Sequence, residues 1–236
     1  MKSSYYKYFA ALLLFGSNGI VASNINLPSY EIVLLRLLLG SLFLITVFTV
    51  SRQRFTFYRN KHTCLYLYIS GSAMGASWML LYEAYQQVGI SIASLAYYCG
   101  PVIVMILSPF LFRETLTWPK IAGFLTVLAG MCLVNLQALD EGKTIWGLFC
   151  GLMSAFMYAL MVTANKKAKP ESGLENSLLQ LVIGSFIVVA FVSMQKNFVL
   201  SLTTIDWIPV LLLGLLNTGI GCYLYFSSIT DLPVQT

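Results

Sequence analysis

Charged residues are scarce in this chain: they make up 10% of its 236 residues, against about 25% in an ordinary soluble domain. So few charges cannot cover a water-facing surface, and the composition therefore excludes a soluble enzyme domain, a disordered chain and a nucleic-acid-binding protein. Histidine is rarer still, and the single one, His62, lies in a basic loop. The five cysteines form no CxxC pair, so we expect no catalytic residue, no metal site and no cofactor.

Hydrophobic residues are abundant instead, at 58% of the chain, and the mean hydropathy is +0.79. A membrane barrel would show short alternating segments of about 10 residues. The apolar residues here form long uninterrupted runs, which favours helices. The sequence therefore predicts an all-α, polytopic helical protein embedded in a lipid bilayer.

Eight apolar runs are long enough to cross a hydrocarbon core, which takes about 20 residues. They cover residues 8–26, 30–50, 64–86, 91–112, 117–136, 145–165, 174–194 and 207–229. The connections are short, especially at 88–90, and no soluble domain is inserted. The longest loops, 51–63 and 166–173, are both basic.

The distribution of basic residues predicts the orientation. If the N-terminus is cytoplasmic, eleven Lys and Arg residues fall on the inner side, only Lys143 and Lys196 fall outside, and Arg36 lies within a span. Cytoplasmic loops retain positive charge, so we expect the N-terminus inside.

An internal repeat is visible in the apolar runs. Residues 75–82 resemble residues 219–226, and the first and sixth runs fit nearly the same offset. A unit of five helices is odd in number, so its second copy would be inverted in the membrane. We expect a first repeat over 1–136 and an incomplete second repeat over 137–236. On this interpretation a ten-helix protein is truncated at the start of a ninth span, or else the chain is an eight-helix variant.

The fourth run carries a helix breaker near its midpoint, at Gly100 and Pro101. Pro101 cannot donate to the carbonyl of Tyr97, so that acceptor is released at membrane depth. Interrupted helices at this depth form binding sites in many transporters. A simple packing kink is the alternative.

Arg36 and Glu83 are the charges most clearly inside the bilayer, at similar depths in its outer half. Charged side chains in spans are costly and usually face the bundle interior. One interpretation is an ion pair that holds spans together, from Arg36 to Glu83 or to Glu31. The other is that Arg36 meets a substrate carboxylate while Glu83 meets an amine or binds a proton.

Aromatic and amide side chains complete the candidate site. Aromatic residues could line a cavity for a planar or cationic solute, or form the interfacial belt. These are Trp78, Tyr82, Tyr85, Tyr97, Tyr98, Tyr158, Tyr223 and Tyr225. Asn18 and Asn217 would either bind solute or form hydrogen bonds between helices.

The sequence resembles the EamA-type branch of the drug/metabolite transporter superfamily along essentially the whole chain. The resemblance rests on Asn18, on Arg36, on the segments 78–85 and 97–102, and on 114–117. It implies ten helices in two inverted five-helix repeats, with solute moved by alternating access through a central cavity.

The resemblance favours a secondary transporter of the bacterial inner membrane that exports a small organic solute such as an amino acid or metabolite. Because Arg36 is the sole candidate cation of the cavity, the solute should be zwitterionic, neutral or cationic rather than polyanionic. No P-loop is present, so a gradient would drive transport, with a proton as the candidate coupling ion. The alternatives are a non-transporting receptor or scaffold, and an intramembrane enzyme.

Overall fold

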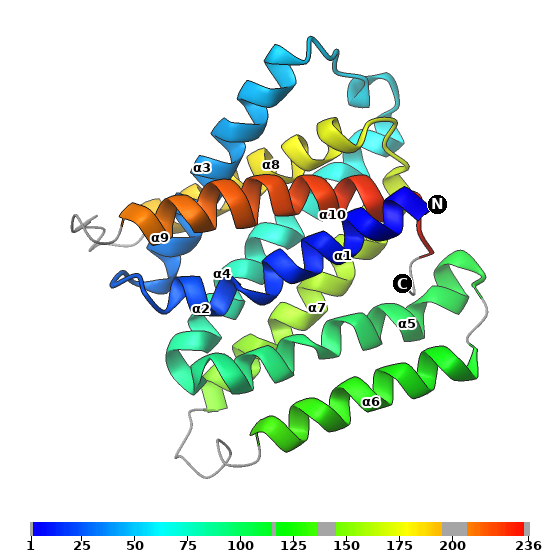
Figure 1. Ribbon diagram of the computed structural model, residues 1–236. Coiled ribbons are helices and arrows are strands. Elements are labelled where there is room, and N and C mark those ends of the chain that lie inside the picture. Colours follow the sequence, from blue (N-terminus) through cyan, green and yellow to red (C-terminus); the bar gives the residue numbers. More distant parts are fainter. Residues whose placement is uncertain (1, 115–116, 136–144, 195–206, 234–236) are drawn as a thin grey trace.

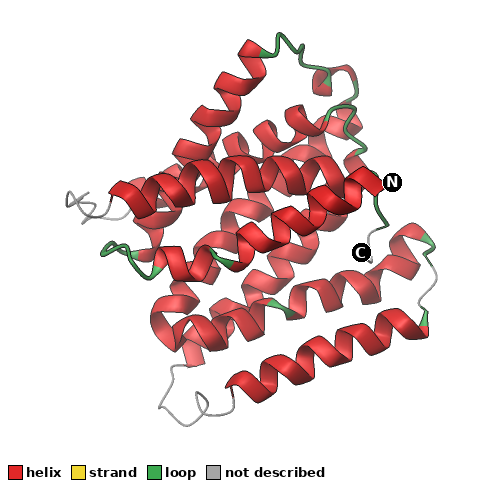
Figure 2. Cartoon of the chain, in the orientation of Figure 1, coloured by secondary structure: helices red, strands yellow, loops and turns green. Residues whose placement is uncertain are grey.

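The computed structural model describes residues 2–114, 117–135, 145–194 and 207–233, and all regular elements within these ranges are helical (Figure 2). In chain order (Figure 1) they are α1 (Lys2–Gly16), α2 (Asn18–Ala22), α3 (Ser29–Val50), the 3-10 turn η1 (Phe57–Arg59), α4 (Lys61–Tyr97), α5 (Cys99–Phe112), α6 (Trp118–Asn135), α7 (Ile145–Ala168), α8 (Gly173–Ser193), α9 (Trp207–Leu211), the π-helical segment η3 (Leu212–Ile220) and α10 (Gly221–Ile229). The predicted all-helical class is therefore confirmed for the described residues.

Five helical stretches of the described residues are long and apolar enough to cross a bilayer. They are Ser29–Val50, Lys61–Phe112, Ile145–Ala168, Gly173–Ser193 and Trp207–Ile229. Each coincides with one or two of the apolar runs in the sequence. The run at 8–26 is divided between α1 and α2, and the run at 117–136 corresponds to α6.

The stretch Lys61–Phe112 holds the two runs that the sequence separates at 88–90. Its 52 residues would extend about 78 Å as one helix, more than twice the thickness of a hydrocarbon core. Gly89 interrupts it with φ 77° and ψ 162°, a backbone conformation that residues other than glycine rarely adopt. A second interruption follows at Tyr98, and α5 then runs back alongside α7 (Figure 1).

Helices α3 and α8 pack against each other, and α3 runs along the upper edge of the molecule in Figure 1. The hydroxyls of Ser41 and Ser185 form a hydrogen bond of 3.0 Å across this contact. Close approach of α4 to α8 depends on glycine, because a Cβ on Gly75 would lie 2.9 Å from the backbone oxygen of Gly184. Small residues at such crossings let helix backbones come near each other inside a membrane.

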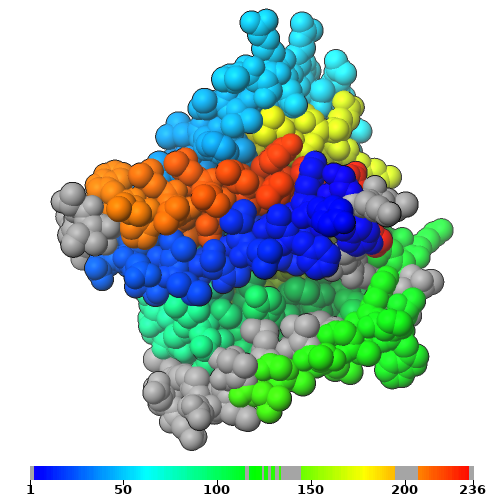
Figure 3. Space-filling model, in the orientation of Figure 1, coloured from blue at the N-terminus to red at the C-terminus, as the bar shows by residue number. Residues whose placement is uncertain are grey.

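Two groups of helices pack against this pair. Helices α4, α5 and α7 pack together and are called the first wall here; α1 packs against η3 and α10, and these form the second wall. Figure 3 shows α1 and α10 side by side on one face of the molecule. Helix α3 contacts α4 and η3, and α8 contacts α4 and α10, so the pair of α3 and α8 joins the two walls.

The two ends of the bundle differ. Ser4 donates a hydrogen bond of 2.9 Å to the carboxylate of Asp231, which brings the start of α1 to the end of α10. We call this the terminal end; the basic loop 51–60 and the basic segment 166–172, formed by the last turn of α7 and the loop after it, meet there as well (Figure 1). The opposite, distal end holds Gly19 and Ile90. Lys143 and Lys196, expected on the outer side, lie outside the described residues.

Candidate functional site

A cavity of about 390 Å³ lies between the two walls, beside α3. Most of the residues proposed from the sequence meet there. Asn18, Arg36, Trp78, Tyr85, Tyr97, Tyr98, Pro101 and Tyr158 all line it. They come from five helices, so the cavity exists only because the walls enclose it.

Arg36 is the charged residue of the cavity lining, and its side chain is only 2% exposed. Its Nε donates to the hydroxyl of Thr218 over 2.9 Å, and its Nη1 donates to the hydroxyl of Tyr82 over 2.6 Å. The guanidinium lies 4.1 Å from the centre of the Trp78 ring, which is cation–π distance. Its Nη2 is buried without a hydrogen-bond partner. Among the contacts of the described residues, Arg36 meets hydroxyls and an aromatic ring rather than the carboxylate of Glu83 or Glu31, which argues against the ion-pair interpretation.

Helix α4 supplies a stripe of aromatic side chains beside Arg36. Trp78, Tyr82 and Tyr85 follow one another at spacings of four and three residues, which places them on one helix face. Tyr82 is 3% exposed, and its ring centre lies 5.3 Å from that of Tyr85. The stripe therefore gives the cavity an apolar, aromatic wall with hydroxyl groups at defined points.

The interruption at Tyr98 positions a second aromatic group. Gly100 and Pro101 lie in the first turn of α5, directly after this interruption. A Cβ on Gly100 would lie 2.7 Å from the Tyr158 ring, so glycine is what lets α5 sit against Tyr158. The ring of Tyr97 meets Tyr158 edge-on, at 5.4 Å between centres. Tyr158 and Tyr225 then join the two walls through a hydroxyl contact of 3.0 Å.

Asn217 lies behind the cavity lining rather than in it. Its amide donates, over 2.9 Å each, to the carbonyl of Leu14, to the Ser17 hydroxyl and to the Asn18 side chain. The helix breaks at Ser17, between α1 and α2, so acceptors at this break need donors from elsewhere. Asn217 therefore satisfies the break and orients Asn18, which does line the cavity.

Glu83 also lies outside the cavity lining. It accepts a hydrogen bond of 3.4 Å from the Ser29 hydroxyl, at the first residue of α3, and one of 3.0 Å from the Gln87 amide. A carboxylate beside the first turn of a helix is favoured by the helix dipole. In the structure Glu83 ties α4 to the start of α3.

Several residues of the site carry no signal in the sequence. Tyr8, Met74, Ser94 and Cys222 line the cavity but belong to ordinary apolar or interfacial patterns. A buried amide network was missed as well. Asn165 and Asn176 exchange hydrogen bonds of 2.9 and 3.1 Å, while Gln180 accepts from Ser70 over 2.9 Å. Polar residues within the apolar runs were the only hint of it.

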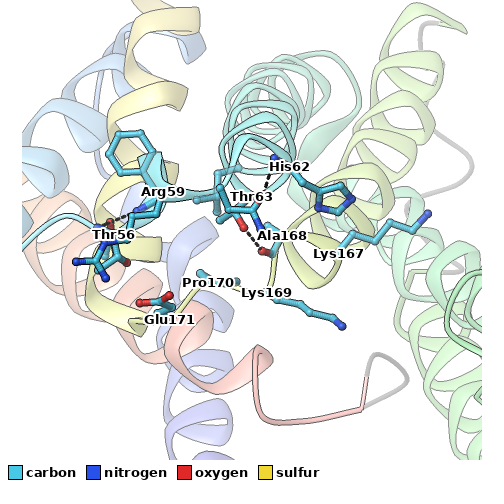
Figure 4. A pocket seen from close by; sticks show the side chains of 13 residues that line it. Thr56, Arg59, His62, Thr63, Lys167, Ala168, Lys169, Pro170 and Glu171 are labelled. Atoms are coloured by element: carbon cyan, nitrogen blue, oxygen red, sulfur yellow. Dashed lines mark hydrogen bonds between the residues drawn. The ribbon is translucent and has the colours of Figure 1, made fainter.

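A second pocket, of about 330 Å³, lies at the terminal end between the loops 51–60 and 166–172. Figure 4 shows Thr63 bonded to the Ala168 carbonyl in this pocket, with Arg59, His62, Lys167 and Lys169 around it. Glu175, 2% exposed, accepts from the backbone of Thr56 and Phe57 and from the Thr56 hydroxyl. This carboxylate fastens the first loop to the start of α8.

Comparison of this chain with known proteins identifies a family and two similar proteins. The EamA-like transporter family matches residues 3–136 and 145–236. An uncharacterized transporter YxxF of Bacillus subtilis (strain 168) is 27% identical over 97% of the chain and 74% of its own length. An uncharacterized transporter of Acidianus ambivalens, named for the sor 3'region, is 27% identical over 55% of the chain and 50% of its own length.

A solved crystal structure of a protein has a TM-score of 0.79 to this chain at 18% identity. It covers 100% of the chain, and the chain covers 82% of it. At this identity the likeness concerns the fold alone.

Proposed function

Because the chain belongs to the EamA-like transporter family, within the drug/metabolite transporter superfamily, we propose that this multi-pass membrane transporter carries a small organic solute through the cavity at Arg36. The preferred solute has one carboxylate and an apolar or aromatic body, as an amino acid does. The observation that carries the proposal is the buried guanidinium whose Nη2 has no partner beside an aromatic cavity.

The chemistry of Arg36 supports one carboxylate in particular. The hydroxyls of Tyr82 and Thr218 accept hydrogen bonds from Nη1 and Nε of Arg36, and the Trp78 ring covers one face of the guanidinium. Nη2 is left as the donor that would bind the solute. A carboxylate would satisfy this donor and neutralise the buried charge. A polyanion would need further cations, and Arg36 is the only Lys or Arg among the lining residues.

We place the transport cycle in two inverted repeats, over 1–136 and 137–236, that alternate access to the cavity. Residue pairs separated by 144 positions support this symmetry. Ser41 and Ser185 form the hydrogen bond between α3 and α8. Glu31 and Glu175 are both buried in the first turn of their helices. Odd-numbered repeats related in this way place a solute site at their interface.

The orientation follows from the charges at the terminal end. The N-terminus and the basic loops 51–60 and 166–172 meet there, and positive loops stay in the cytoplasm. We therefore place the terminal end in the cytoplasm of a bacterial cell, with export as the direction of transport. A proton bound by Glu83 remains the candidate coupling ion.

The proposal is tested by counterflow in proteoliposomes, with a panel of radiolabelled amino acids and of their decarboxylated amines. The parent protein should exchange at least one carboxylate solute, and Arg36→Gln should abolish this exchange. Arg59→Gln, at an exposed position, is the matched control and should exchange normally. Exchange of amines alone, or exchange that persists in Arg36→Gln, would refute the role of Arg36.

The coupling ion has its own test. Exchange and proton-driven uphill transport by Glu83→Gln are measured beside the parent from pH 5.5 to 8.5, about three pH units around neutrality. If Glu83 carries the proton, the variant loses uphill transport and retains exchange. Unchanged uphill transport in Glu83→Gln would remove this residue from the coupling mechanism.

A further inference from the structure

Side chains reach across from one wall to the other at the terminal side of the cavity. Tyr158 of α7 and Tyr225 of α10 meet through their hydroxyls at 3.0 Å. The ring of Tyr8, from α1, stacks on Tyr225 with 5.9 Å between centres. These three rings line the cavity and connect the two walls.

Lys166 makes a second connection between the walls, nearer the terminal end. Its Nζ donates to the carbonyl of Ile229 over 3.1 Å, to that of Thr230 over 3.2 Å, and to that of Leu232. An ammonium group has three donors, and all three are engaged. The acceptors lie at the end of α10, where the last carbonyls of a helix lack partners within it.

Lys166 lies beyond the cavity residues, toward the terminal end. It follows the cavity residue Met161 by five positions on α7, about 7.5 Å along the helix. Ile229 follows the cavity residue Phe226 by three positions on α10, about 4.5 Å. Asp231, which accepts from Ser4 of α1, is part of the same end of α10. The ends of α1, α7 and α10 are thus joined just beyond the ring layer.

The distal end is closed differently. There α2, which packs against η3 of the second wall, meets Ile90 in the first wall, since a Cβ on Gly19 would lie 2.9 Å from Cγ2 of Ile90. This contact is apolar and carries no directional bond. Separation of the walls at the terminal end must break the three hydrogen bonds of a charged group; separation at Gly19 and Ile90 must break none at this contact.

We infer that Lys166 is the latch that holds the cavity shut toward the terminal end, and that it releases the end of α10 when the walls separate there. The inference rests on the proposed transport function, in which the cavity opens to one end at a time. Lys166 acts through α10 rather than by touching the solute, so it is a positioning residue. Its neighbour Lys167 lines the second pocket instead.

Cys222 is a natural reporter for this opening, because it lines the cavity and is 1% exposed. The four other cysteines are replaced by alanine, and Cys222 is labelled with a membrane-impermeant maleimide in inside-out and right-side-out vesicles. Lys166→Met keeps the aliphatic stem and removes the donors. We expect it to raise labelling from the terminal end by about threefold to tenfold, as the loss of a charged hydrogen-bonded contact implies.

Lys167→Met is the matched control and should label at the parent rate. Lys166→Arg restores donors and should return labelling toward that rate. Should Lys166→Met not fold, Lys166→Gln, which retains an amide donor, serves in its place. A rise from the terminal end alone supports the latch. An unchanged rate, or an equal rise from both ends, overturns it. Labelling needs no solute, so a failure of counterflow in the parent protein would reject the proposed function without affecting this result.

Discussion

Arg36 shows how a single charge is held inside this bundle. Burial of a cation without compensation costs several kcal/mol. Here the compensation comes from two hydroxyls, of Tyr82 and Thr218, and from the face of the Trp78 ring. These groups are neutral, so they stabilise the cation without cancelling its charge. Arg36 therefore keeps an affinity for anions that a partner carboxylate would have consumed.

Substitution of Arg36 by lysine tests this arrangement at constant charge. An ammonium group cannot bond Tyr82 and Thr218 while lying flat on Trp78, since it lacks the planar fork of arginine. We expect Arg36→Lys to weaken solute binding about tenfold, close to 1.4 kcal/mol, in a titration of the purified protein. Arg59→Lys is the exposed control. Binding within twofold of the parent would show that charge alone is recognised.

Glu175 is a buried charge with a structural role. Its carboxylate accepts from the backbone N–H of Thr56 over 2.6 Å, from that of Phe57 over 2.9 Å, and from the Thr56 hydroxyl over 2.6 Å. Glu175→Gln points an amide donor at these donors and should destabilise the protein by about 1–3 kcal/mol. Thermal unfolding in detergent measures this. Glu171→Gln, at an exposed position of the same loop, should unfold with the parent.

At the scale of elements, the interruptions of the helices gather around the cavity. The break between α1 and α2 presents Asn18, the break between α4 and α5 presents Tyr98, and η3 brings Thr218 to Arg36. π-helical segments are rare and often found at functional sites. Irregular backbone at membrane depth is tolerated where protein or a cavity surrounds it. The three interruptions are therefore the elements that shape the site.

The close contact of α4 with α8 requires a residue without a Cβ at position 75. Gly75→Ala would place its Cβ 2.9 Å from the Gly184 oxygen. A backbone atom cannot move aside as the end of a flexible side chain can, so we expect a loss of about 1–3 kcal/mol in stability. Gly123→Ala in α6, where a Cβ meets nothing within 4 Å, is the matched control and should be neutral or slightly stabilising. Equal melting temperatures for the two variants would contradict this account of the α4–α8 contact.

At the scale of the whole molecule, the asymmetry of the two ends supports both the proposed orientation and the proposed mechanism. The terminal end carries the chain's N-terminus, the basic loops and the Lys166 contacts. The cavity lies between this end and the apolar contact at Gly19 and Ile90. The basic residues used to propose the orientation and the hydrogen bonds used to propose the closure of the cavity are thus located at the same end.

The orientation predicts the reactivity of Cys64, an exposed cysteine near the start of α4 at the terminal end. In intact cells a membrane-impermeant maleimide should leave Cys64 unlabelled, and in inside-out vesicles it should label it. The variant under test keeps Cys64 as its sole cysteine, and Cys64→Ser gives the background. Labelling in intact cells would place the terminal end outside and reverse the proposed orientation.

The sequence by itself determined the class of this protein and most residues of its candidate site. Charge is so rare within the apolar runs that Arg36 stands out without a structure, and the breaker at Gly100 and Pro101 does so as well. The position of Glu83 could not be obtained in this way. Its partners include a hydroxyl 54 residues away, an amide one turn further along α4, and the Tyr30 side chain. Depth in the membrane alone does not distinguish these partners from Arg36.

Only the tertiary structure decided what each polar group meets. Arg36 bonds Tyr82 and Thr218, which are 46 and 182 residues distant in sequence, and Lys166 reaches the end of α10 across 63 to 66 residues. The apolar pattern of a membrane helix specifies that the helix lies in the bilayer. It does not specify which face meets another helix, because lipid can contact any apolar face. Which polar groups face one another depends on how the helices pack, and close packing is set by small residues and shape rather than by hydropathy.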